Sequence, residues 1–475
     1  MSAAFKGAAA LLLAALLGAC ADMGTLGKPQ PVLDAAGVGA TATPPALIWP
    51  DDKWWTVFGD RQLDSLVDRA LVGSPDLATA AARLSRANAE SAYARGDTGP
   101  SVDGNVSSKR QRYSANDIFP PPIGGRTVWA NAIGLSASYE FDFFGRQQAA
   151  LDRALGNERA ASAQLQATRV LLAARVASEY FALARLVEQR DIAIATRDQR
   201  DQIRVLVNDR VSAGLDTNVE LRQAEGSVPE VAQELELIDE NIGLARHRLA
   251  IVAGLPVDTF AALTPRLSAA RPLALPESIP ADLLGRRADI AAARARVEAT
   301  HAGVSEAKAR FYPNIDLQAM VGLGAVGFGN WFEAGSRQYA IGPAVTLPIF
   351  ESGRLRANLR GAAADVDEAV ASYNQTLLTA VGEVADVATS MRFIERQAVQ
   401  QRAAQAAAES AYDLSVQRYR AGLGTFLTVL SAQNNVFVQR RSATDLSARA
   451  LDAQVTLMRA LGGGYIAANA QEQHS

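Results

Sequence analysis

The chain is poor in the side chains from which most catalytic and metal sites are built. Its 475 residues include one cysteine and three histidines, His247, His301 and His474, which are far apart in the sequence. A single cysteine excludes an internal disulfide, and scattered histidines without cysteines beside them predict no metal cluster. No Gly-x-Ser-x-Gly segment marks a nucleophilic serine. We therefore expect no enzyme activity, no metal and no cofactor.

An excess of one charge and long apolar runs are also lacking. The chain has 47 basic and 50 acidic residues, a net charge of −3, which excludes the basic field that binds nucleic acid. Outside residues 8–17, no apolar run is long enough for a transmembrane helix. If this chain enters a membrane, we expect it to do so with β-strands, because closed β-barrels are the other structure that satisfies its backbone in lipid.

The N-terminus has the pattern of a lipoprotein signal. An apolar run at residues 8–17, too short to cross a bilayer, leads into Leu17-Gly18-Ala19-Cys20, which resembles the bacterial lipobox. We predict a signal peptide at residues 1–19 and lipidation (palmitate) of Cys20 after cleavage. Ala21 after the cysteine favours sorting to the outer membrane. A plain secretory signal with a coincidental cysteine is the alternative.

The body of the chain uses one pattern twice. Gly145 and Gly353 begin equivalent stretches and Gly214 and Gly422 end them, and the members of each pair lie 208 residues apart. A duplication this long excludes a short-period solenoid and indicates a large scaffold with internal pseudo-symmetry. The predicted organisation is a flexible lipidated linker at 20–48, a first repeat at 49–255, an equatorial connection at 256–285, a second repeat at 286–463 and a polar tail at 464–475.

Each repeat contains two segments that alternate between apolar and small or polar residues. The predicted strands are 101–112, 128–141, 314–324 and 338–349. In the second of them, Trp129, Leu135 and Tyr139 share one face, and Gly134 and Ser136 share the other. The lengths suit tilted membrane strands with lipid on one face and water on the other. A soluble sandwich is the alternative.

Four strands cannot close a barrel wide enough to hold water. Open strand edges are not tolerated in lipid, because their backbone groups would lack hydrogen-bond partners. If these are membrane strands, several chains must share one barrel. The sequence therefore predicts a ring-shaped homo-oligomer.

Long segments of good helix formers follow the strands. The predicted helices are 146–212, 217–254, 353–421 and 425–461. The first is about 100 Å long at about 1.5 Å per residue. Each hairpin turns at an Ala-Gly-Leu tip, where Gly214 or Gly422 suits a helix C-cap, and Thr217 with Glu220 forms a capping box. Two such hairpins predict coiled-coil-like walls. The alternative is a tethering coiled coil, which leaves the strands unexplained.

An ordered set of short motifs resembles the outer-membrane efflux protein (TolC-like) family, in particular its OprM/NodT-type lipoprotein branch. The segments are Trp54-Trp55 with the stretch to Leu77, Leu283 to Ile290, Leu347 to Phe350 and Arg418 to Gly422. Each motif is weak by itself, but together they cover nearly the whole chain in the order of the family. Two positions depart from its usual pattern: Ala288 stands in place of proline, and Ser74 in place of asparagine.

The resemblance implies a mainly α protein with a membrane β part. Three chains would share a twelve-stranded outer-membrane β-barrel, and their helices would form an α-barrel tunnel through the periplasm. The implied function is a passive exit duct for efflux or multidrug resistance, which receives substrates from an inner-membrane transporter through a periplasmic adaptor. A general diffusion pore and a periplasm-spanning structural lipoprotein are the alternatives.

The same resemblance places the adaptor contact and the gate at the helical tips. The adaptor would contact Arg210, Gly214, Leu215, Arg418, Gly422 and Leu423. The candidate gate residues are Asp216, Glu220, Tyr419, Thr428, Leu430 and Ser431. Family members often place acidic residues where Thr428 and Ser431 stand here. We therefore hypothesise that a charge gate uses Asp216 and Glu220 instead; alternatively, these two acids only cap their helix.

Overall fold

The computed structural model describes residues 23, 25, 27–33, 50–116, 118–269 and 287–465. These residues form two compact units. The first unit comprises Arg83–Ala161, Ala293–Tyr373 and the described residues up to Val32, and the second comprises the described residues of Leu33–Ala82, Ser162–Ala292 and Asn374–Ser475. The predicted signal peptide, Cys20, most of the linker, most of the 256–285 connection and nearly all of the tail lie outside the described residues.

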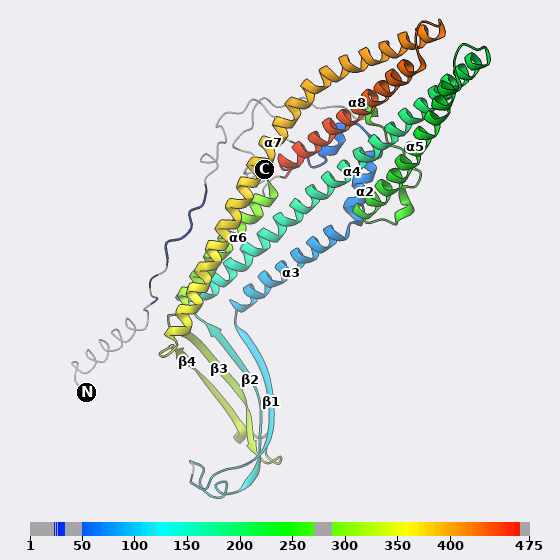
Figure 1. Ribbon diagram of the computed structural model, residues 1–475. Coiled ribbons are helices and arrows are strands. Elements are labelled where there is room, and N and C mark those ends of the chain that lie inside the picture. The colour runs from blue at the N-terminus through cyan, green and yellow to red at the C-terminus, as the bar shows by residue number, and fades with distance from the viewer. Residues whose placement is uncertain are drawn as a thin grey trace. The chain divides into compact units, whose positions relative to one another are not determined.

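The first unit contains one antiparallel sheet of four strands in the order β1-β2-β3-β4, drawn in Figure 1. The strands are β1 (Ser101–Arg112), β2 (Thr127–Glu140), β3 (Asn314–Val326) and β4 (Arg337–Thr346). All four were predicted, and the largest difference is at the end of β4, which was expected to reach residue 349. Pro348, which lacks the N–H that a ladder needs, lies two residues past this end.

The two repeats join at the pairing of β2 with β3. Gly134 lies opposite Gly322 in this ladder. A Cβ on Gly134 would lie 2.9 Å from the carbonyl oxygen of Val321, and a Cβ on Gly322 would lie 2.5 Å from that of Ile133. Glycine is therefore required on both strands, because the backbones approach too closely for a side chain.

Helical segments continue from the sheet within the first unit. The elements are α3 (Pro75–Asp97), the start of α4 (Arg146–Ser212), α6 (Ala288–Ala309) and the start of α7 (Ser352–Arg420). Gly156 of α4 packs closely on Ala299 of α6, since an added Cβ would lie 2.8 Å from the Cβ of Ala299. Phe311, Leu355 and Leu359 form a small core beside these helices.

Part of the N-terminal segment lies against α7. Met23 packs on the core that contains Phe311, and the backbone N–H of Gln30 donates to Oδ1 of Asp367 at 3.0 Å. In the second unit, the N–H of Leu33 donates to Oδ1 of Asn374 at 2.9 Å. The linker that was expected to be flexible is thus held to α7 by its described residues.

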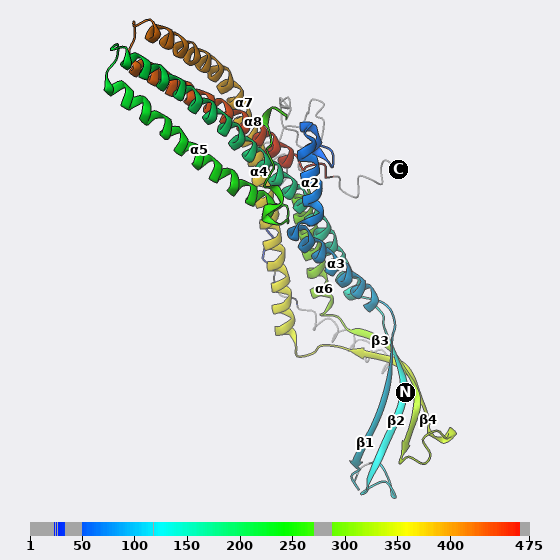
Figure 2. The ribbon, with the colours of Figure 1, turned by 90° about the vertical axis from the view of Figure 1, so that its right-hand side faces the viewer.

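The second unit consists mainly of the far portions of two helical hairpins, which run side by side in both ribbon views (Figures 1 and 2). α4 and α5 (Asn218–Val252) form one hairpin, and α7 and α8 (Phe426–Ala460) form the other. The bounds agree with the predicted helices within two residues. The largest apolar core of this unit includes Trp54, Trp55, Phe58, Tyr180 and Phe181. Trp54, Trp55 and Phe58 lie in the short helix η2 (Trp54–Phe58), which precedes α2 (Arg61–Gly73).

A buried arginine connects the start of α6 to the second hairpin. The side chain of Arg287 is 7% exposed and forms ion pairs with Asp289 at 2.7 Å and Glu383 at 3.0 Å. It also donates to the carbonyl oxygen of Ala460 at 3.2 Å, and Glu383 forms a second ion pair with Arg459 at 2.9 Å. A buried guanidinium with this many partners is expensive to disturb, because loss of any one carboxylate leaves a desolvated charge.

Candidate functional site

The two hairpin tips have the same backbone geometry. Each helix ends before a glycine with positive φ, 70° at Gly214 and 74° at Gly422. The N–H of Leu215 donates to the carbonyl of Arg210 at 2.9 Å, and the N–H of Leu423 donates to that of Arg418 at 2.8 Å. The N–H of Gly214 donates to the carbonyl of Val211, and the N–H of Gly422 donates to that of Tyr419, both at 3.0 Å. Together these four bonds form two Schellman motifs. The glycines therefore set the turn that was predicted for them.

The leucine that follows each glycine is exposed. Leu215 is 64% exposed and Leu423 is 69% exposed. In a Schellman motif this position usually packs on an apolar side chain one turn back, but here that position is an arginine in both tips. The two leucines are thus available for an external contact.

The first tip contains the predicted capping box. The N–H of Val219 donates to Oγ1 of Thr217 at 3.2 Å, and the N–H of Thr217 donates to Oε2 of Glu220 at 3.0 Å. These bonds lower the pKa of Glu220, and the side-chain bond with Thr217 is the largest cause. Glu220 is therefore a helix-capping carboxylate in this structure.

Asp216 has a different environment from Glu220. Nε and Nη2 of Arg210 donate to the Asp216 carboxylate at 2.8 and 3.3 Å, and the hydroxyl of Tyr419 also donates to it. The Arg210 guanidinium lies over the Tyr419 ring, 4.6 Å from its centroid. We call these three residues the tip clasp. The clasp connects the turn of the first hairpin to α7 of the second, across 203 residues of sequence.

The tip clasp is shielded from solvent, and its contacts shift the pKa values of its residues. The side chains of Arg210 and Asp216 are each 12% exposed, and Tyr419 is fully buried. The bond from Arg210 is the main cause that lowers the pKa of Asp216. Burial, followed by the bond to Asp216, raises the pKa of Tyr419. Asp216 is thus a charged, fully partnered carboxylate at neutral pH.

An apolar cluster supports the clasp from all four helices. Its buried members are Ile203 and Val207 of α4, Ala224 of α5, Tyr419 of α7, and Phe426 and Val429 of α8. Leu430 packs on this cluster and is partly buried, whereas Thr428 and Ser431 are exposed. Of the six candidate gate residues, the structure brings Asp216, Tyr419 and Leu430 to one place, with Glu220 on the adjacent helix turn. Thr428 instead contributes to the start of α8, where its N–H donates to Oγ1 of Thr425 at 3.4 Å.

Sequence reasoning missed a second connection between the hairpins. Arg200 of α4 is buried and donates to the carbonyl of Ser227 at 2.6 Å and to Glu230 at 3.0 Å, both on α5. It also donates to Oδ1 of Asn434 on α8. No sequence signal could have identified Arg200, because α4 contains eleven arginines at polar positions and the other ten are exposed or only partly buried.

The sheet of the first unit presents an apolar face to solvent. Cross-strand partners share a face, and the register pairs Leu135 with Val321 and Val321 with Tyr339. Tyr339 is 85% exposed and Ile341 is 75% exposed. Soluble monomers rarely expose an apolar surface of this kind. β1 and β4, the outer strands of the sheet, also have one open edge each among the described residues.

Aromatic side chains border the apolar face at both ends. Near the β2–β1 and β3–β4 loops, the rings of Trp129 and Phe328 lie 5.7 Å apart. Near the helices of this unit, Tyr139 and Phe141 lie 5.1 Å apart. The ten residue-to-residue steps from Trp129 to Tyr139 span about 33 Å along the strand, or about 25 Å if the strand is tilted by about 40°. That height and the two aromatic girdles are typical of a membrane strand.

No described helix is long and apolar enough to cross a membrane. The described part of the chain likewise has no cluster of three or more His, Cys, Asp or Glu that could hold a metal ion.

Comparisons with known proteins agree with this architecture. FusA, a fusaric acid resistance protein of Burkholderia cepacia, is 38% identical over 382 residues, which cover 77% of this chain and 71% of FusA. The outer membrane protein OprJ of Pseudomonas aeruginosa is 33% identical over 466 residues, 97% of this chain and 96% of OprJ.

Solved structures give the same result. The outer membrane protein VceC of Vibrio cholerae superposes with a TM-score of 0.83 at 34% identity, covering 88% of this chain and 100% of VceC. The outer-membrane channel OprN superposes with a TM-score of 0.82 at 27% identity, covering 93% of this chain and 98% of OprN. A family model described as "Outer membrane efflux protein" matches residues 66–255 and 279–463. The resemblance seen in the sequence is confirmed: the chain belongs to the outer membrane efflux protein family.

Proposed function

We propose that this chain is the outer-membrane exit duct of a tripartite efflux system, through which substrates pass passively from an inner-membrane pump and a periplasmic adaptor to the exterior. The observation that carries the proposal is the sheet of the first unit, with its exposed apolar face, its two aromatic borders and its two open edges. The same chain contains two helical hairpins far longer than globular folds use.

The open edges support a ring of chains. β1 and β4 each have unpaired backbone groups on one side, which lipid cannot satisfy. If β4 of one chain pairs with β1 of the next, three chains give twelve strands and leave no edge. A barrel of twelve strands is wide enough for a water-filled lumen, whereas four strands are not. The homotrimer is therefore the assembly that we propose.

The tips support a contact with a periplasmic adaptor. Leu215 and Leu423 are exposed on rigid Schellman turns, and Arg418 is exposed beside them. Preorganised turns lose little entropy on binding. We propose that the adaptor contacts these residues, with Gly214 and Gly422 fixing their geometry. Arg210 would contribute through the tip clasp rather than by direct contact, because its side chain is committed to Asp216.

The tip clasp is our candidate for the gate. It joins two hairpins that must separate for a tunnel to widen at its end, and it depends on one carboxylate. Glu220 supports the same turn as a capping residue, and Leu430 packs beneath it. Opening in this proposal means loss of the Asp216 contacts when the two hairpins separate.

Attachment of lipid at Cys20 fits the position of the following residues. Met23 packs on Phe311 and Leu355, which lie next to the start of β3 and the start of α7. An acyl chain on Cys20 would supplement the sheet as a membrane anchor.

The cargo is set by the pump in this proposal. Relatives at similar identity carry names that point to different substrates: pyoverdine export for OpmQ of Pseudomonas putida and fusaric acid resistance for FusA. One duct architecture with several cargoes is expected when the duct has no binding pocket of its own.

Electron microscopy of the detergent-purified mature protein tests the duct. We expect hollow cylinders with threefold symmetry, partly inside the micelle and partly outside. A compact monomer, or a rod without a micelle-embedded ring, would contradict both the barrel and the duct, and would favour a structural lipoprotein. A general diffusion pore is the remaining alternative. It would form the ring but would not capture an adaptor through the 210–217 and 418–425 tips.

A further inference from the structure

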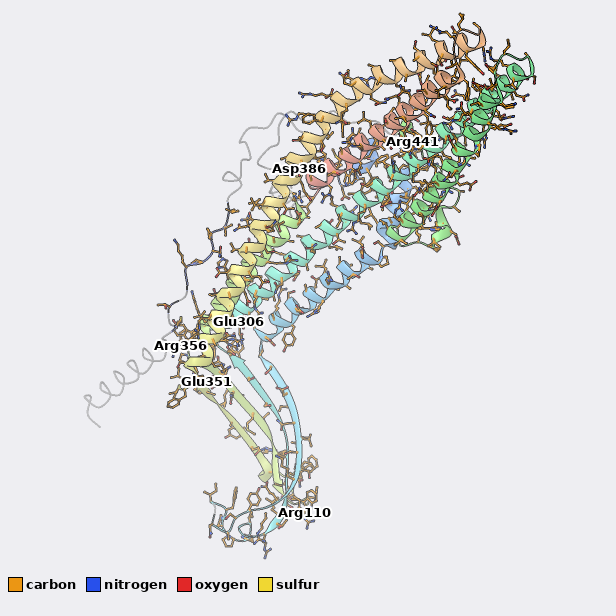
Figure 3. The ribbon with its side chains drawn as sticks, viewed as in Figure 1. Arg110, Glu306, Glu351, Arg356, Asp386 and Arg441 are labelled. Carbon is orange, nitrogen blue, oxygen red and sulfur yellow. The ribbon has the colours of Figure 1, made fainter. Side chains whose placement is uncertain are left out.

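We propose that Arg110, Arg112 and Arg337 bind the phosphate groups of lipid head groups in the outer leaflet of the membrane. We call these three residues the outer-end arginines. The inference rests on the proposed function, because it requires the sheet to lie in a membrane with its two loops outside. Figure 3 labels Arg110 at the loop end of the sheet, away from Glu306 and Glu351 beside the helices of the same unit.

The strand register places the outer-end arginines on the apolar face. Arg110 lies opposite Trp129 and, two positions on, Arg112 shares its face. Arg337 lies opposite Leu323, which belongs to the apolar side of β3. Lys109 directly precedes Arg110 in the same strand. Its side chain therefore points to the opposite, polar face, since side chains alternate along a strand.

In the strand register, Arg110 is level with the aromatic border, Arg112 lies just beyond it, and Arg337 is level with Ile133, inside it. The Trp129–Phe328 pair marks one end of the apolar face, and Arg110 is the cross-strand partner of Trp129. An arginine at this depth can lay its aliphatic stem along the apolar surface and extend its guanidinium into the head-group layer. A soluble anion would not explain why the charge continues the apolar face of the sheet.

The outer-end arginines are exposed and have no carboxylate partner among the residues that the structure describes. Burial or an ion pair would have explained their charge as a structural feature. A guanidinium exposed to solvent suits phosphate, whose oxygens it can contact through two parallel N–H donors.

Basic and acidic residues are concentrated at opposite ends of the sheet. Segments 107–130 and 325–339 at the loop end contain five basic and two acidic residues. Segments 97–101, 139–146, 312–316 and 346–354 at the helix end contain five acidic and two basic residues. A uniform surface for solubility would mix both signs at each end. A basic loop end and an acidic helix end fit a sheet whose outer border meets anionic head groups.

The proposed ring brings the outer-end arginines of different chains together. Arg110 and Arg112 lie on β1, and Arg337 lies on β4, so they occupy opposite edges of one sheet. If β4 of one chain pairs with β1 of the next, all three residues reach the same end of each seam between chains. A phosphorylated head group bound there would contact two chains and stabilise the oligomer.

The test measures how much lipid the purified oligomer retains. The probe is diphosphoryl lipid A, with monophosphoryl lipid A and phosphatidylcholine for comparison, detected by native mass spectrometry. We compare wild type, the triple variant Arg110→Gln, Arg112→Gln, Arg337→Gln, and the matched control Lys109→Gln on the opposite face of the same strand. One basic residue near an anionic surface is worth about fivefold in affinity, so the triple variant should bind diphosphoryl lipid A roughly a hundredfold more weakly. The control should match wild type.

Equal retention by wild type and the triple variant would overturn the proposal, as would equal loss in the Lys109→Gln control. If the triple variant does not assemble, Arg337→Gln and Arg337→Lys replace it, and the lysine variant should recover most of the binding because it keeps the charge. Wild type that forms no membrane oligomer would contradict the proposed function. An intact oligomer with unaltered lipid binding in the variants would contradict this inference alone.

Discussion

The two hairpin tips have nearly the same backbone but different side-chain contacts. Both end in a Schellman motif with an exposed leucine. In the first tip, Asp216 holds Arg210 and Tyr419. In the second, the equivalent position is Gly424, 208 residues later, and Arg418 has no carboxylate partner among the described residues. Its Nη2 donates only to the carbonyl of Leu423, at 3.3 Å.

The N-terminal caps of α5 and α8, the helices that follow the two tips, also differ in whether they contain a carboxylate. Thr217 is paired with Glu220 in a capping box. Its equivalent, Thr425, has Thr428 three residues on, and the two hydroxyls lie 3.0 Å apart. The first tip thus uses carboxylates at both positions, and the second uses none. The backbone turn is the same in both tips, but the first tip pairs its arginine with a carboxylate and the second does not.

The largest effect is expected from removal of the Asp216 charge. Asp216→Asn leaves the guanidinium of Arg210, 12% exposed, without its anion, which costs about 1–3 kcal/mol at the tip. If the clasp closes the duct, single-channel conductance in planar bilayers should rise several-fold.

Controls for this variant separate gating from helix capping. Glu220→Gln removes the charge of the capping residue but keeps an acceptor, and it should leave conductance near the wild-type value. Tyr419→Phe removes one hydrogen bond of the clasp and should give an intermediate value. If the double variant Asp216→Ala, Glu220→Ala left both conductance and closure unchanged, the gate hypothesis would be wrong.

The next largest effect is expected on adaptor binding, which should depend on Arg418 more than on Arg210. Arg418→Ala should weaken capture of the adaptor by roughly tenfold, the usual consequence of removing an arginine anchor, with little change in conductance. Arg210→Ala should change conductance and leave most of the adaptor affinity. Surface plasmon resonance of the two variants against an immobilised adaptor, with paired conductance traces, checks this. Equal effects of both substitutions on binding would contradict the comparison between the tips.

The sequence predicted the scaffold better than the clasp. Alternation and helix propensity located the four strands and the four helices of the hairpins, because these signals are local and repeat along the chain, whereas α3 and α6 were not predicted. The caps were equally readable, as Thr217 with Glu220 confirms. The clasp depends on contact between residues 203 positions apart, and no local pattern reports that distance. Asp216 was identified as a charge, but its pairing with Arg210 became visible only when the turn brought them together.

Lowering the pH is expected to have a smaller effect on conductance. The folded-state pKa of Asp216 lies below its ordinary value of 3.8, so the contribution of the carboxylate is complete above that value and is lost as the pH falls through the lowered one. Conductance of wild type should therefore stay constant from neutral pH down to about pH 4 and rise below it. Asp216→Asn should lack this rise. The same pH dependence in the variant would assign the rise to other groups.

The smallest effect is expected when the missing carboxylate is supplied to the second tip. A Cβ on Gly424 would meet the Cβ of Arg418 and the N of Tyr419 at 3.5 Å, an ordinary contact, so Gly424→Asp can be accommodated. The new carboxylate should pair with Arg418, and an exposed pair contributes about 0.2–1 kcal/mol. Adaptor affinity should fall by no more than about fivefold, because Arg418 must leave this partner to bind. Gly424→Asn has the same shape without the charge and should bind as wild type does. A similar loss in both variants would mean that Gly424 matters for its size, and the free arginine would no longer explain the difference between the tips.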